Sequence, residues 1–162
     1  MSAPIVIAAA RRTPIGAFQG IFAPVSATQL GAVAAKAAIA DAGIDPATLD
    51  EAIFGCVLPA GLGQAPARQA ALGAGVALGV PATTVNKMCG SGMKAVMLGA
   101  DQIRAGSADV VLAGGLESMT NAPYLMLKAR AGYRMGTAEI YDHMFYDGLT
   151  SPWDGKAMGC FA

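Results

Sequence analysis

Apolar residues along the chain recur in short runs that alternate with longer stretches of helical spacing. Short apolar runs rich in β-branched residues predict strands, whereas apolar residues three or four positions apart predict helices. The elements predicted in this way are strands at 5–10, 52–58, 83–86 and 110–114 and helices at about 26–42, 66–78 and 90–105. Strands that alternate with helices predict an α/β fold with a mainly parallel sheet covered on both faces.

The predicted helix ends carry capping signals. Ser26 and Gln29 have the Ser-x-x-Gln spacing of a capping box, and Gly43 stands where that helix should stop. Asp45 before Pro46 predicts a short extra turn of helix, since proline is tolerated in the first helical position. The helix at 66–78 is rich in alanine and glycine, so we expect it to pack closely against its neighbours.

Cys89 is the candidate nucleophile, because it lies on the predicted turn between a strand and a helix. Backbone N–H groups are unpaired at a helix N-terminus and favour an anion there, either a thiolate or a developing oxyanion. Gly90 and Gly92 follow and leave space for a substrate to reach the sulfur. The alternative interpretation is a buried cysteine without chemistry, which is the usual state of a free cysteine.

Composition suggests that part of the surface is covered by something else. The chain is 54% apolar and only 14% charged, against averages of about 45–50% and about 25%. A further subunit or a further part of the fold would hide this excess. The zero net charge gives no sign of a nucleic-acid surface. We expect no membrane segment, because the longest uncharged run, 13–35, contains two prolines and two glutamines. We also expect no signal peptide, because the N-terminus has no charged region followed by an apolar core.

Three cysteines and one histidine give little support for a metal site. Cys56, Cys89 and Cys160 form no Cys-x-x-Cys pair, and only His143 accompanies them. Without a secretory signal we expect no disulfides and a reducing cytoplasm. We predict that Cys56 is a core thiol, that Cys160 has a packing role, and that His143 lies at the surface or an interface without acting as a base.

Several motifs, in order along the chain, resemble those of the thiolase family. The stretch from Asn86 to Gly92 resembles the thiolase nucleophile motif, and Ala113 to Met119 resembles its Gly-Gly-x-Glu-Ser-Met element. Further matching elements lie at 11–16, 121–124, 146–150 and 158–159. Within the family the resemblance is greatest to acetyl-CoA acetyltransferases.

The resemblance implies an architecture. Residues 1–118 would form the first βαβαβαβ half of the layered αβαβα thiolase fold, and 119–162 would begin the loop domain that covers coenzyme A. The chain resembles only the front part of a thiolase, so we expect a truncated or cleaved chain, or one whose remainder is a separate polypeptide. The complementary C-terminal half would supply a catalytic histidine, an asparagine and a second cysteine. We expect a homodimer or homotetramer, with 85–88 and the next helix at the interface.

The resemblance also implies a reaction. The whole enzyme would condense two acetyl-CoA molecules to acetoacetyl-CoA and CoA, and run the reverse thiolysis, through an acyl-Cys89 intermediate. Coenzyme A thioesters would be substrates, and no cofactor or metal is implied. Leu149 and Met158 match positions that line the acyl and pantetheine pocket, and Glu117 is expected to be a buried, hydrogen-bonded structural group.

Alternatives remain open at this point. Ala157 stands where acetyl-CoA acetyltransferases often have histidine, which leaves a 3-ketoacyl-CoA thiolase of longer acyl range possible. A β-ketoacyl synthase also uses a cysteine, but the residues after Cys89 disfavour it. A non-catalytic assembly chain of the same fold is a third alternative. The basic residues Lys128, Arg130 and Arg134 would attract CoA phosphates or would form a solvated face or an oligomer contact.

Overall fold

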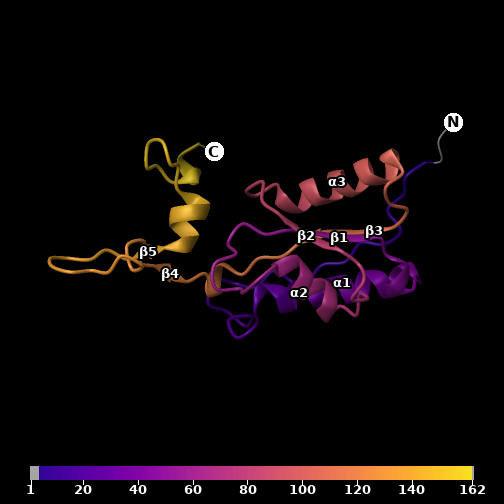
Figure 1. Ribbon diagram of the computed structural model, residues 1–162, viewed down its shortest axis with the longest axis horizontal. Coiled ribbons are helices and arrows are strands. Elements are labelled where there is room, and N and C mark those ends of the chain that lie inside the picture. The colour runs from indigo at the N-terminus through magenta and orange to yellow at the C-terminus, as the bar shows by residue number, and fades with distance from the viewer. Residues whose placement is uncertain (1–3, 162) are drawn as a thin grey trace.

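A layered α/β body forms most of the molecule. The computed structural model describes residues 4–161. Its main elements are α1 (Ala27–Ala42), β1 (Glu51–Gly55), α2 (Pro66–Gly73), β2 (Ala82–Val85), α3 (Ser91–Ala105) and β3 (Val111–Gly115). The strands form one parallel sheet in the order β2-β1-β3. In Figure 1, α3 covers one face of this sheet and α1 and α2 cover the other, so the predicted α/β class and the parallel, two-sided sheet are confirmed.

The capping signals are confirmed at both ends of α1. The Ser26 side chain accepts from the Gln29 backbone, and the Gln29 side chain accepts from the Ser26 N–H. Gly43 ends the helix with a left-handed φ of 65°, which glycine adopts at little cost. Asp45 caps a short 3₁₀ turn, Pro46–Thr48, as predicted.

The predicted strand at 5–10 is wrong, because these residues have no regular structure. Val6 and Ile7 are 74% and 78% exposed. Strand propensity reflects a fit to a pleated, half-buried surface, and this run has no such surface to lie on.

Two other predicted elements are shorter than expected. β1 stops at Gly55, because the N–H groups of Val57 and Leu58 donate to the Glu117 side chain and not to a neighbouring strand. The second helix stops at Gly73, and Gly75, at φ 92°, turns the chain away from helical geometry.

Small residues let the helices approach closely. Ala67, Ala70 and Ala71 of α2 are at most 1% exposed, and a Cβ added at Gly73 would lie 2.9 Å from the Ala32 side chain of α1. This confirms the predicted close packing of the second helix. On the other face, a Cβ at Gly55 would lie 2.4 Å from the Ser91 backbone, so glycine here lets the start of α3 rest directly on the sheet.

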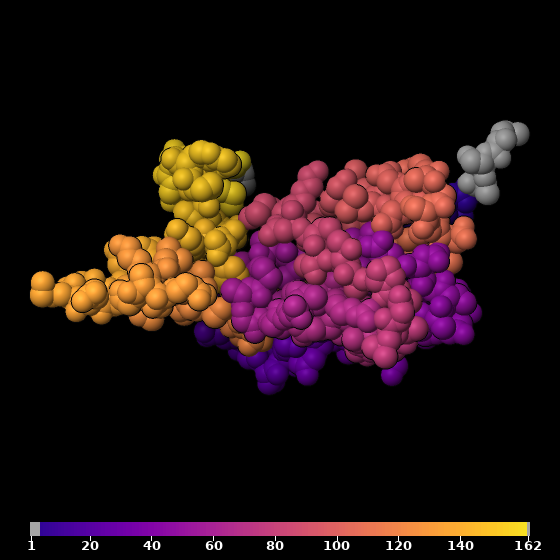
Figure 2. All heavy atoms as spheres, in the orientation of Figure 1, coloured from indigo at the N-terminus to yellow at the C-terminus, as the bar shows by residue number. Residues whose placement is uncertain are grey.

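The chain after β3 leaves this body. It contains a 3₁₀ turn (Met119–Asn121), the antiparallel pair β4 (Tyr124–Leu125) and β5 (Tyr141–Asp142), a π-helical segment (Met144–Leu149) and a short 3₁₀ helix (Met158–Phe161). Figures 1 and 2 show this part extending to one side, with the connection between β4 and β5 reaching furthest. Among the helices of residues 4–161, none combines the length and apolar character needed to cross a membrane.

Candidate active site

Cys89 lies on the turn that joins the carboxyl end of β2 to α3. Gly90 is the residue before the first turn of α3, and Cys89 is exposed. The predicted place of Cys89 between a strand and a helix is confirmed, and its role as the nucleophile stays a prediction. Cys89 thus directly precedes the N-cap of a 15-residue helix, whose dipole has its positive end there.

Side chains on both sides of Cys89 stabilise the turn through hydrogen bonds. Met88 has a left-handed φ of 48°, which is uncommon for a residue with a side chain and costs on the order of 1 kcal/mol. The Asn86 side chain accepts from the Met88 N–H at 2.9 Å. Ser91, only 3% exposed, accepts from the Lys87 N–H at 2.8 Å and donates to the Met88 carbonyl at 2.5 Å. These bonds offset the cost and fix the direction of Cys89.

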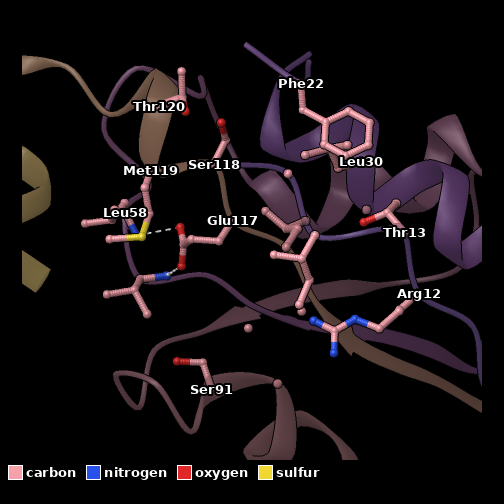
Figure 3. A pocket seen from close by; sticks show the side chains of 18 of the residues that line it. Arg12, Thr13, Phe22, Leu30, Leu58, Ser91, Glu117, Ser118, Met119 and Thr120 are labelled. Atoms are coloured by element: carbon pink, nitrogen blue, oxygen red, sulfur yellow. Dashed lines mark hydrogen bonds between the residues drawn. The ribbon is translucent and has the colours of Figure 1, made fainter. Parts of the chain in front are cut away.

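Cys89 opens into a cavity of about 700 Å³. The walls come from the chain before α1, one side of α1, the loop after β1, the turn that carries Cys89 with the start of α3, the segment after β3 and the π-helical segment. In Figure 3, Arg12 and Thr13 lie on the side away from Leu58 and Met119, with Glu117 between them. The motifs at 11–16 and 113–119, distant in sequence, therefore meet at Cys89.

Of the two predicted substrate-binding residues, one lines the Cys89 cavity and the other does not. Leu149 lines the Cys89 cavity together with Met144 and Gly148. Met158 is 40% exposed and is not among the described residues that line the cavity. Lys128, Arg130 and Arg134 are exposed on the connection between β4 and β5 and are likewise not among the lining residues.

Glu117 is hydrogen-bonded as predicted, but it is half-buried and not fully buried. It accepts from the N–H groups of Val57 at 2.8 Å and Leu58 at 3.0 Å, the bonds drawn in Figure 3. Cys56 is 1% exposed, with its sulfur 3.6 Å from the same carboxylate. Burial, and then the nearby Glu117 charge, raise the pKa of the Cys56 thiol to about 12. The prediction of a core thiol is confirmed.

Two side-chain predictions differ from the structure. Cys160 is exposed in a short helix with no buried residues, so it does not pack against the rest of residues 4–161. His143 is 4% exposed, so its expected position at the surface or an interface is wrong, and its expected lack of a base role stays a prediction. Its ring contacts the Asp147 carboxylate at 2.5 Å, and the Ala60 N–H donates to Nε2 at 3.3 Å. Asp147 follows His143 by four residues, a spacing at which two side chains of a helix meet, so this contact could be found from the sequence. The contact with Ala60 spans 83 positions and has no such local pattern. Among residues 4–161, no three or more potential metal ligands cluster together.

The three thiols are expected to react in different ways. Iodoacetamide at about pH 8 should leave Cys56 unmodified in the folded protein, because with a pKa of about 12 only about one thiol in 10⁴ is ionised and it is also buried. Cys89 should react fastest, because it is exposed beside a helix N-terminus, and Cys160, exposed without that feature, is the internal control. Peptide mass mapping over time measures the three rates. Cys160 reacting as fast as Cys89 would contradict the expected effect of the helix.

Known proteins similar in sequence to this chain come from one family. Residues 5–162 match the family described as "Thiolase, N-terminal domain". The chain is 53% identical to an acetyl-CoA acetyltransferase of Saccharomyces cerevisiae, in an alignment that covers all of this chain and 41% of the relative. It is 51% identical to the acetyl-CoA acetyltransferase of Pseudomonas aeruginosa and 50% identical to that of Cupriavidus necator, with 98% of the chain and 40% of each relative covered. The chain thus spans about two fifths of the length of the curated relatives it matches.

Proposed function

The chain belongs to the thiolase family, and we propose that it supplies the nucleophile-bearing part of an acetyl-CoA C-acetyltransferase. The enzyme condenses two acetyl-CoA molecules to acetoacetyl-CoA and CoA and also runs the reverse thiolysis. The observation that carries the proposal is Cys89, exposed at the start of α3 in a cavity where the family motifs meet. Relatives named acetyl-CoA acetyltransferase, at about 50% identity, support the substrate class.

In the first half-reaction, the Cys89 thiolate attacks the thioester carbonyl of acetyl-CoA. A new S–C bond forms, the carbonyl electrons move onto oxygen, and their return expels the CoA thiolate and leaves an acetyl-enzyme. The backbone N–H of Cys89, just before α3, would hold the oxyanion, and the positive end of the helix dipole would favour the negative charge there.

In the second half-reaction, a base removes a proton from C2 of a second acetyl-CoA, and the resulting carbanion attacks the acetyl-enzyme and releases Cys89. His143 is unsuited to this work, because it is buried and both ring nitrogens are engaged. We place the base in the C-terminal half of the enzyme. Leu149, in the cavity wall, is assigned to the acyl pocket, and Met158, outside it, to a more outward part of the CoA thioester.

The surface of the body supports an assembly. Met93, Val96 and Met97 on α3 are between 43% and 73% exposed, an arrangement that exposes an apolar stripe to solvent. β2 is an edge strand, and exposed edges favour pairing with another chain. We propose that the C-terminal half and a second copy of the enzyme cover these surfaces in a homodimer or homotetramer. Three free cysteines fit a reducing compartment, and we place the enzyme in the cytoplasm.

The test uses a chimeric enzyme, in which residues 1–162 are continued by the C-terminal part of the Saccharomyces cerevisiae relative. Incubation with acetyl-CoA alone should leave one acetyl group on the peptide that contains Cys89, and free CoA should remove it. Peptide mass spectrometry measures both steps. A chimeric enzyme that cleaves acetoacetyl-CoA while its acetyl group is found on another residue would refute the assignment of Cys89.

A further inference from the structure

The loop after β1, residues 57–60, is held by two side chains from distant parts of the chain. Glu117 accepts from the N–H groups of Val57 and Leu58, and His143 accepts from the N–H of Ala60 at 3.3 Å. Glu117 follows β3 in the body, whereas His143 lies immediately before the π-helical segment. The loop therefore joins the two parts of the molecule through its backbone.

The hydrogen bonds of His143 define its protonation. The Ala60 N–H can only donate, so Nε2 must be an acceptor. Nδ1 then carries the proton, and the Nδ1–H group donates a hydrogen bond to the Asp147 carboxylate at 2.5 Å. The histidine backbone is fixed as well, because its N–H donates to the Pro123 carbonyl at 3.1 Å. The neutral imidazole thus links Asp147, on the π-helical segment, to the Ala60 backbone.

The two segments joined by this link form two walls of the Cys89 cavity. A Cβ added at Gly148, one residue after Asp147, would lie 3.1 Å from the Leu58 side chain. Leu58 and Gly148 both line the cavity. The Asn86 side chain, three residues before Cys89, donates to the Val57 carbonyl at 3.4 Å, so the same loop lies beside the Cys89 turn. A small shift of the π-helical segment would change the space available to a group attached to Cys89.

We infer that His143 is a positioning residue: it fixes the π-helical segment against the loop at 57–60 and thereby restricts the length of the acyl group that the Cys89 cavity accepts. The inference rests on the proposed acyl-transfer function. His143 acts through Ala60 and Gly148 and does not touch the reacting atoms. A π-helix is rare and is found most often at functional sites, which agrees with a role in shaping the cavity.

Two substitutions separate the two hydrogen bonds of the imidazole. In His143→Gln, the side-chain oxygen reaches the position of Nε2 and still accepts from Ala60. In His143→Asn, the shorter amide reaches only the position of Nδ1 and leaves the Ala60 N–H without its acceptor. Asp147→Asn keeps an acceptor for Nδ1–H, whereas Asp147→Leu removes it. In Asp147→Leu the ring proton is therefore free to move to Nε2, which then no longer accepts from the Ala60 N–H. Asp147 is exposed, so this second pair tests the link with little risk to folding.

Each variant is made in the chimeric enzyme and measured in two ways. Hydrogen exchange of the Ala60 amide reports the link without any need for activity. The ratio of kcat/KM for acetoacetyl-CoA to that for 3-ketohexanoyl-CoA reports acyl selectivity. For His143→Asn and Asp147→Leu we expect faster exchange and a ratio lowered about 10-fold, the lower end of the discrimination that one methylene group gives in an apolar pocket. His143→Gln and Asp147→Asn should stay within about twofold of the parent in both measurements.

The outcomes distinguish the two proposals. A parent enzyme without thiolysis would refute the proposed function, while exchange at Ala60 would still report the link. Faster exchange in His143→Asn with an unchanged ratio would overturn the positioning role. An equal loss of selectivity in His143→Gln and His143→Asn would also overturn it, because the bond to Ala60 would then not be the cause.

Discussion

Cys89→Ala in the chimeric enzyme is expected to abolish thiolysis and condensation, with kcat lowered on the order of 10⁴-fold or more. The expected loss is this large because no acyl-enzyme can form without the sulfur, and binding alone gives little of the rate. Cys89→Ser should leave only trace activity, since an alcohol is far less ionised than a thiol. Steady-state cleavage of acetoacetyl-CoA by CoA measures all of these rates.

The chain offers a matched control for this substitution. Cys160 is also exposed and also free, so Cys160→Ser makes a similar chemical change away from the Cys89 turn and should leave kcat within about twofold. Circular dichroism of the Cys89→Ala protein should match that of the parent, because an exposed side chain on a turn contributes little to the core. Residual turnover above about 1% in Cys89→Ala would mean that the nucleophile has been wrongly assigned.

Features that depend on neighbouring residues could be predicted from the sequence. The capping box of Ser26 and Gln29 spans three positions, and its geometry is determined almost entirely by those residues. The turn that carries Cys89 also depends on residues close in sequence, since Asn86 and Ser91 make the hydrogen bonds that stabilise it. The position of Cys89 between a strand and a helix can therefore be predicted from its neighbours in the sequence alone.

Features that depend on contacts between residues distant in sequence could not be predicted from the sequence. The bond from Ala60 to His143 spans 83 positions, and that from Val57 to Glu117 spans 60. No periodicity in the sequence indicates such pairs, so the sequence predicts a surface or interface position for His143, which is in fact buried. At residues 5–10 the sequence instead predicts an element that does not form. Val6 and Ile7 favour a strand by propensity, but the structure has no strand there.

Within residues 4–161, no free base faces the Cys89 cavity and an apolar stripe is exposed. Among residues 4–161 the only carboxylate lining the Cys89 cavity is Glu117, and it is engaged by the N–H groups of Val57 and Leu58. His143 is buried and engaged as well. Neither group is free to take a proton from the thiol or from the second substrate. The stripe on α3, led by Met93 at 73% exposure, also has no cover.

Residues 1–162 expressed alone are therefore expected to give no measurable cleavage of acetoacetyl-CoA, at least about 10³-fold below the chimeric enzyme, because a positioned base alone contributes about 10²–10⁴-fold. They should also associate or bind hydrophobic dyes, as exposed apolar stripes do. The chimeric enzyme, with the same 162 residues, is the matched control for both measurements, and light scattering compares their association. If the isolated chain turned over at a rate close to that of the chimeric enzyme, residues 1–162 would have to contain the base, and the division of labour proposed for the two halves would be wrong.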